Sequence, residues 1–85
     1  IDLSLPMAEN LGVYPNPATS FVTLVFDKNE IDRIRIFSMN SQLVYSINEL
    51  SSNRLEIDLT NFKHGVYVVV FEGKTSVRYK KVLVK

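Results

Sequence analysis

Few residues of this chain have the types and spacing that catalysis needs. His64 is the only histidine, and we interpret it as an exposed turn residue between Lys63 and Gly65. A nucleophilic mechanism needs a base held beside a nucleophile and oriented by an acid, and no such set accompanies His64. The chain has no cysteine, which excludes thiol catalysis, disulfides and thiolate metal sites. The sequence therefore predicts a domain that is not an enzyme, without catalytic residues, metal or cofactor.

The acidic residues do not form a convincing cation site either. The densest group of oxygen ligands consists of Asp27, Asn29, Glu30 and Asp32. A helix-loop-helix calcium site needs a central glycine and a distal glutamate. Neither stands at the required spacing, and Lys28 lies inside the group. We interpret this segment as a polar hairpin turn, and the isolated Asp58 as a carboxylate that is solvated or bonded to a neighbouring turn.

Basic residues gather near the end of the sequence. They are Arg78, Lys80, Lys81 and Lys85, with no acid among them. On a strand, Lys80 and Lys81 point to opposite faces. Two interpretations stay open: lysines on an edge strand discourage aggregation between sheets, or they form a docking signal whose charge steers the encounter with a partner. The formal net charge of the chain is only +1, which argues against nucleic acid as a partner.

The length of 85 residues allows one domain. A domain of this size buries roughly 60% of the surface that its unfolded chain exposes. No apolar run approaches the ~20 residues of a membrane-spanning helix, so we expect no direct membrane insertion. Residues 1–10 lack the basic start of a signal peptide. We expect residues 1–10 to be a linker or lead segment, residues 11–85 to be the domain, and the chain to be a piece of a longer protein.

The elements that position these residues are predicted to be strands. Apolar and polar residues alternate with a period of two, which is typical of half-buried strands. The predicted strands cover residues 11–14, 21–26, 33–36, 42–47, 54–59, 66–71 and 76–84. About seven short strands at regular spacing, and no helical segment, predict an all-β, immunoglobulin-like β-sandwich of mostly antiparallel strands.

The same alternation predicts which residues form the core. Val22, Leu24 and Phe26 share one face of their strand. Residues 66–71 are apolar on both faces, which predicts a central strand that is covered on both sides. We expect Val66, Val68 and Val70 to be core residues, and Val68→Asp to unfold the domain by burying an unpaired charge.

Four sequence blocks resemble, in order, the motifs of a known family. Residues 13–24 begin Val-Tyr-Pro-Asn-Pro-Ala and are similar to its opening motif, and residues 36–44 are similar to a strand ending in a turn. Residues 57–59 (Ile-Asp-Leu) precede residues 65–67 (Gly-Val-Tyr), and residues 80–85 form a closing basic strand with paired lysines. This pattern resembles the type IX secretion C-terminal sorting domain, also called the Por secretion system sorting domain, of Bacteroidetes.

The chain departs from the family pattern at one turn. The family's Asn-Gly is Asn40-Ser41 here, and the arginine that follows is Gln42. Glycine suits a positive φ and serine does not. We therefore expect a longer turn, or a turn of another type, at this position.

The resemblance implies a C-terminal secretion signal on an exported cargo protein. The implied partners are the type IX outer-membrane translocon, a surface sortase that removes the domain on its N-terminal side, and an N-terminal cargo domain in the same chain. The implied route runs through the periplasm to the outer-membrane surface or the extracellular medium. We expect the secretion machinery to recognise Lys80, Lys81, Val82, Leu83, Val84 and Lys85. The structural residues of the family motifs are Tyr14, Pro15, Asn16, Pro17, Asp58, Gly65 and Tyr67.

A second function stays open at this point. Sandwiches of this size host many functions, and the alternative to the sorting signal is a carbohydrate- or protein-binding module appended to a secreted hydrolase or adhesin. A sugar-binding face usually presents aromatic residues in a row. Phe37, Tyr45 and Tyr67 are the residues for such a row if they face the solvent.

Overall fold

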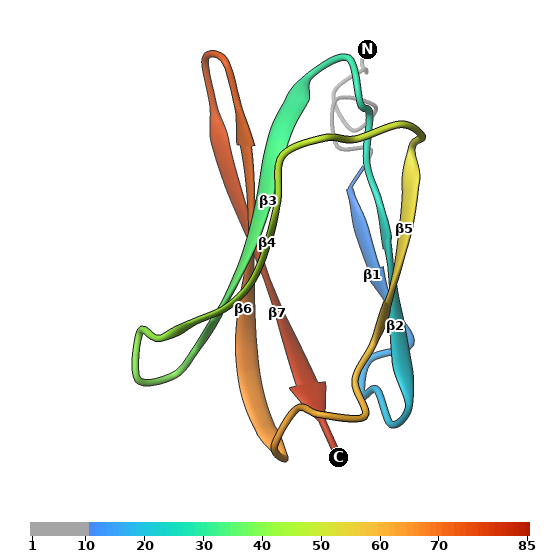
Figure 1. Cartoon of the computed structure of the whole chain (residues 1–85), viewed down its shortest axis with the longest axis vertical. Coiled ribbons are helices and arrows are strands. Elements are labelled where there is room, and N and C mark those ends of the chain that lie inside the picture. The colour runs from blue at the N-terminus through green and yellow to red at the C-terminus, as the bar shows by residue number, and fades with distance from the viewer. Residues whose placement is uncertain (1–10) are drawn as a thin grey trace, which may run out of the picture.

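The structure, a computed structural model, describes residues 11–85, which form two antiparallel sheets packed face to face (Figure 1). The strands are β1 (Gly12–Tyr14), β2 (Phe21–Val25), β3 (Ile31–Ser38), β4 (Leu43–Ile47), β5 (Arg54–Asp58), β6 (Gly65–Gly73) and β7 (Val77–Val84). The first sheet has the order β1-β2-β5, and the second has the order β4-β3-β6-β7. The predicted all-β, immunoglobulin-like sandwich is confirmed. The expected lead segment, residues 1–10, lies outside the described residues.

The core lies between the two sheets, as the alternation in β2, β3 and β5 predicts. Val22 and Leu24 of β2 face Ile34 and Ile36 of β3, and none of these four side chains is more than 1% exposed. Phe71 of β6 is fully buried at the centre. Burying a side chain of this kind contributes about 1.5–3 kcal/mol. The core is therefore built from the residues that the period of two assigns to the inner faces.

The predicted face of β6 is wrong, although its central place is right. β6 lies between β3 and β7, but Val69 and Phe71 are its fully buried residues. Val66 and Val68 are only partly buried on the outer face, whereas Val70, on the same face, is buried as predicted, at 7% exposed. Every residue from Val66 to Phe71 is apolar, so alternation cannot tell the two faces apart, and the register with β3 decides which one faces the core.

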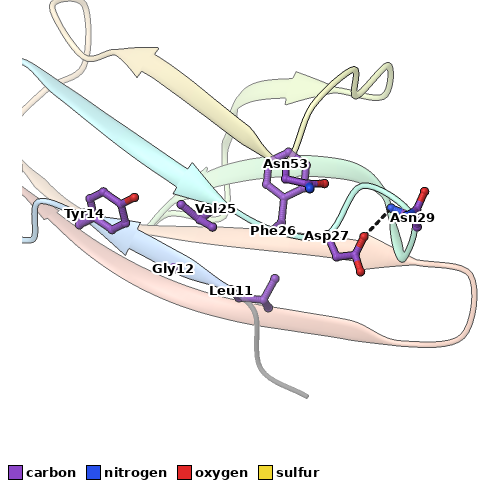
Figure 2. Close-up of a pocket in the computed structure, with 8 residues that line it drawn as sticks. All are labelled: Leu11, Gly12, Tyr14, Val25, Phe26, Asp27, Asn29 and Asn53. Atoms are coloured by element: carbon purple, nitrogen blue, oxygen red, sulfur yellow. Dashed lines mark hydrogen bonds between the residues drawn. The ribbon is translucent and has the colours of Figure 1, made fainter. Parts of the chain in front are cut away.

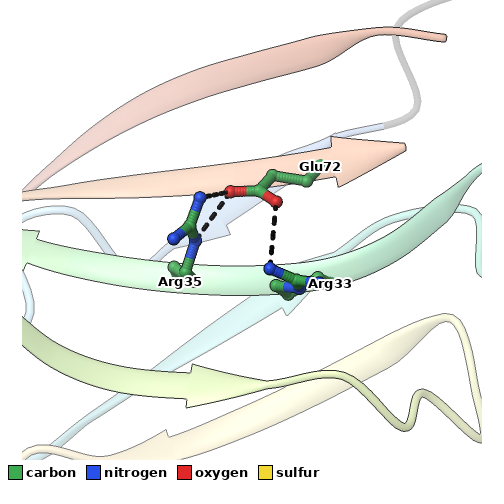
Figure 3. Close-up of polar contacts among 3 residues, drawn as sticks. All are labelled: Arg33, Arg35 and Glu72. Atoms are coloured by element: carbon green, nitrogen blue, oxygen red, sulfur yellow. Dashed lines mark hydrogen bonds and ion pairs between the residues drawn. The ribbon is translucent and has the colours of Figure 1, made fainter. Parts of the chain in front are cut away.

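The outer face of the second sheet is held by an ion-pair cluster. Arg35 of β3 donates hydrogen bonds from both Nε and Nη2 to Oε2 of Glu72 on β6, with an Nε–Oε2 distance of 2.6 Å. Nη1 of Arg33 lies 3.7 Å from the other carboxylate oxygen of Glu72 (Figure 3). The Arg35 guanidinium also lies 5.6 Å from the ring centre of Phe37. A partly exposed cluster of this kind stabilises the β3–β6 pair modestly.

Two turns show how local backbone geometry shapes the hairpins. Ser41, in the β3–β4 turn, has a φ of 65°, the positive value that we expected a serine to avoid. The Ser41 N–H donates to the Ser38 carbonyl at 3.0 Å, and the Ser38 N–H donates to the Gln42 carbonyl at 2.9 Å. Ser41 therefore adopts the positive φ that glycine normally provides at this position. At Gly73, a Cβ atom would lie 2.2 Å from the Glu30 carbonyl oxygen, so only glycine fits.

Candidate functional site

The predicted recognition residues lie on β7, an edge strand of the second sheet. Val82 and Val84 point inward and are each 3% exposed. Lys81, Leu83 and Lys85 point outward and are exposed. The side chains that a partner can reach are therefore the outward ones, whereas the two valines hold the strand in the core.

Lys80 differs from its neighbour Lys81. It is half-buried and shares the inner side of β7 with Val82, whereas Lys81 is exposed on the outer side. The paired lysines thus point to opposite faces, as the alternation predicts. A partner that approaches the outer face meets Lys81 first.

The opening motif is attached to the open edge of β7 through Asn16. Its Nδ2 donates to the Lys81 carbonyl at 3.1 Å, and its Oδ1 accepts from the Leu83 N–H at 3.0 Å. The side-chain amide therefore makes the two bonds that a backbone peptide group of a neighbouring strand would make. Proline on either side has no N–H to donate, so the side chain of Asn16 takes over the pairing.

Ala18 continues the pairing through its backbone. Its N–H donates to the Leu83 carbonyl at 2.7 Å, and its carbonyl accepts from the Lys85 N–H at 2.8 Å. These bonds form a short parallel bridge to Val84, and the Ala18 side chain is fully buried. We call the contacts of Asn16 and Ala18 with β7 the Asn16–Ala18 clamp. Asn16 and Ala18 both belong to the opening motif quoted from the sequence, but the sequence did not indicate that Ala18 pairs with β7.

The residues on either side of Asn16 lie where the chain passes from the first sheet to the edge of the second. The peptide bonds before Pro15 and Pro17 are both cis. Tyr14 ends β1 and pairs with Thr23 of β2. Its hydroxyl accepts a hydrogen bond from Nη2 of Arg54 at 3.2 Å. The chain is thus held by the first sheet at Tyr14 and by the second sheet from Asn16 onward.

Asp58 closes the end of β5. Its Oδ1 accepts the Thr60 N–H at 2.9 Å and also the Thr60 hydroxyl. These two bonds, the side-chain bond first, hold the pKa of the Asp58 carboxyl below its usual value. Asp58 is exposed, so its role is that of a turn residue, as one of the two interpretations of the sequence held.

Gly65 and Tyr67 shape the connection from β5 to β6. Gly65 has a φ of 147°, which favours glycine. The Tyr67 hydroxyl donates to the Lys63 carbonyl at 2.7 Å, and its ring meets that of Phe62 edge-on at 5.3 Å. Tyr67 is only 6% exposed, so this motif residue supports the fold from inside.

No described group of residues is arranged for catalysis. His64 is exposed in the β5–β6 connection, as expected. The segment that begins at Asp27 is a turn, but the predicted hairpin is wrong, because β2 and β3 belong to different sheets. In this turn Oδ1 of Asp27 accepts the Asn29 N–H at 2.9 Å (Figure 2). The cavity of about 630 Å³ beside this turn has Asp27 as the single carboxylate among its described lining residues. Within residues 11–85, no set of three histidine, cysteine or acidic residues could hold a metal ion.

The aromatic row proposed for sugar binding does not form. Tyr67 is buried, and Tyr45 packs against the core on the same side of the sheet. Phe37 faces the opposite side and lies beneath the Arg35 guanidinium. The three aromatic residues are thus divided between two faces of the sheet, and none offers an open ring.

No helix within residues 11–85 is long and apolar enough to cross a membrane.

The architecture defines the class of protein: a small immunoglobulin-like sandwich whose last strand is clamped by its opening motif. A family model described as the secretion system C-terminal sorting domain matches residues 12–85, so the chain belongs to this family. The chain is also 28% identical over 76 residues to ulvan lyase NLR42 of Nonlabens ulvanivorans. That match covers 88% of this chain and 14% of the lyase, so the chain spans a small part of this relative.

Membership of the family gives the function of the domain. It is a C-terminal secretion signal of the type IX system, and it marks the protein that carries it for export to the cell surface or the extracellular space. The sorting domain is not itself catalytic, and it works with the type IX machinery and an attached cargo.

Proposed function

We propose that the domain delivers an N-terminal cargo domain of the same chain to the type IX translocon of the outer membrane. A surface sortase then removes the domain on the N-terminal side of the sandwich. In this proposal residues 11–85 are the sorting domain, residues 1–10 are the segment that links it to the cargo, and the chain contributes no catalysis of its own. The activity of the cargo is a property of the attached domain.

We propose further that the machinery recognises the end of β7, residues 80–85. The outward side chains of Lys81, Leu83 and Lys85 make the contacts, and Lys80 adds charge at the edge. Val82 and Val84 act indirectly, because their burial fixes the direction of the outward side chains. The absence of any acid in β7 supports this proposal, since a basic strand attracts an acidic receptor surface.

The Asn16–Ala18 clamp is the observation that carries the proposal. It joins the opening motif of the family to its closing basic strand through four hydrogen bonds. The two motifs that identify the family in the sequence therefore form one structural unit. This unit presents the basic strand in a fixed conformation for a receptor.

The test of the proposal is a fusion of the 85-residue chain to a periplasmic reporter in a host with a working type IX system. We expect the fusion on the cell surface or in the medium, and the reporter alone in the periplasm. In a host without the translocon, the fusion should stay in the periplasm. A folded fusion that stays in the periplasm of the competent host would contradict the proposed function.

A further inference from the structure

In the described part of the chain, hydrogen bonds occupy only the second half of the β7 edge. β1 lies beside β7 but does not pair with it. The Asn16–Ala18 clamp pairs with the Lys81 carbonyl, both backbone groups of Leu83, and the Lys85 N–H. These groups point away from β6, and backbone direction alternates along an antiparallel strand. The N–H and carbonyl of Val77 and Tyr79 therefore point to the same edge, as does the Lys81 N–H. Within residues 11–85, no strand pairs with this part of the edge.

The side chains along this half suit a contact with another chain. Tyr79 is 67% exposed and Val77 is 47% exposed, both on the outer face. Cross-strand pairs that include an aromatic or β-branched residue stabilise a sheet. Figure 1 shows the end of the β6–β7 hairpin standing apart from the first sheet. The open half of the edge, Val77–Lys81, thus offers backbone groups and apolar side chains together.

The positive charge of β7 determines which kind of strand can pair with its open edge. Two copies of the strand paired antiparallel about Tyr79 would bring Lys80 and Lys81 of both copies into one small sheet. Like charges close together across a strand pair destabilise the pairing. A strand with acidic side chains near these lysines meets opposite charges instead, so a second copy is disfavoured and an acidic segment is favoured.

We propose that the open half of the β7 edge, Val77–Lys81, binds an extended acidic segment of a protein partner as an additional strand. The Asn16–Ala18 clamp restricts the addition to this half, because it already occupies the edge groups from the Lys81 carbonyl onward. The inference rests on the proposed function, since it gives the partner chemistry of the same strand. Strand addition is a recurring mode of recognition at exposed sheet edges.

Amide exchange in the 85-residue chain tests the strand addition directly. The probe is a short capped peptide that alternates glutamate with threonine, and the control peptide has lysine in place of glutamate. At about ten times its dissociation constant, the glutamate peptide should slow exchange of the Tyr79 and Lys81 amides about tenfold. The Leu83 amide, which already donates to Asn16, should change little. Added salt should weaken the effect.

A matched pair of variants separates backbone pairing from the tyrosine ring. Tyr79→Pro removes an N–H that points away from β6, so the β6–β7 ladder keeps its bonds. Tyr79→Thr removes the ring and keeps the N–H. We expect the proline variant to lose binding of the glutamate peptide and the threonine variant to retain it within a few fold. If the proline variant does not fold, the exchange measurement on the unchanged chain decides.

Several results would overturn the strand addition. Examples are unchanged Tyr79 and Lys81 amides at millimolar glutamate peptide, an equal effect of the lysine peptide, or a dimer that protects these amides without peptide. The outcome is distinct from that of the secretion test. An exported reporter together with unprotected amides contradicts the strand addition and leaves the sorting function in place. Protected amides together with a reporter that stays in the periplasm contradict the sorting function and leave the strand addition in place.

Discussion

The side-chain oxygen of Asn16 accepts a hydrogen bond from the backbone N–H of Leu83, 67 positions further along the chain. Through this bond and its partner at the Lys81 carbonyl, the opening motif stabilises the strand that carries the basic residues. Asn16→Ala leaves both backbone groups to water, and we expect a loss of about 1 kcal/mol in the free energy of unfolding. Urea unfolding measures the loss, and amide exchange should become faster at Leu83. Asn61→Ala, at an exposed turn position, is the control and should leave both unchanged.

The two faces of β6 should differ sharply in their tolerance of charge. Val69→Asp buries a carboxylate in the core and should prevent folding. Val68→Asp, which the sequence alone predicts to be equally damaging, should give a folded domain, because Val68 lies on the outer face opposite Lys81. Circular dichroism and urea unfolding distinguish the variants. A folded Val69→Asp variant, or an unfolded Val68→Asp variant, would show that the register of β6 is wrong.

Ser41 is expected to store strain in the β3–β4 turn. A residue other than glycine at positive φ costs about 1–2 kcal/mol. Ser41→Gly should therefore stabilise the domain by about 1 kcal/mol, after allowance for the greater freedom of glycine in the unfolded chain. Ser41→Ala keeps the strain and should give no gain. Equal stability of the glycine and alanine variants in urea would rule out the strain.

Asp58 should give the domain a measurable dependence on acid. The pKa of its carboxyl is lowered in the folded state by the Thr60 hydroxyl and N–H. The unfolded state therefore binds the proton more tightly, and the stabilising contribution is present above the usual aspartate pKa. It is lost as the pH falls through the folded pKa. Thr60→Val removes the hydroxyl and should raise the Asp58 pKa in an NMR titration; an unchanged pKa would contradict the assigned cause.

The sequence predicted the elements whose pattern is local. In β3 and β5 apolar and polar residues alternate, so Ile34 and Ile57 were assigned to the inner faces and are buried there. In β6 both faces are apolar, and only the pairing with β3 and β7 decides that Phe71 faces inward. Alternation carries no information about pairing between strands. For this reason the strand order of the two sheets was not predicted.

The sequence predicted which residues belong to the candidate site, but it did not predict how they lie relative to one another in space. The basic strand and the motif residue Asn16 were both singled out from the sequence, but their contact joins positions far apart in the chain. Ala18 has no chemical signature that distinguishes it from any small buried residue. The exposed position of Tyr79 depends on β7 being the last strand of its sheet, which follows only from the topology.

The most direct test of the account is the export of the reporter fusion with Lys81→Gln and Lys85→Gln introduced together. Removal of residues 80–85 is a poor test, because it deletes Val82 and Val84 from the core. The matched control carries Lys28→Gln and Lys74→Gln, two exposed turn lysines outside residues 80–85. We predict that the control fusion reaches the surface or the medium and that the β7 variant, equally folded, stays in the periplasm. Equal export of both variants would contradict recognition through the basic strand.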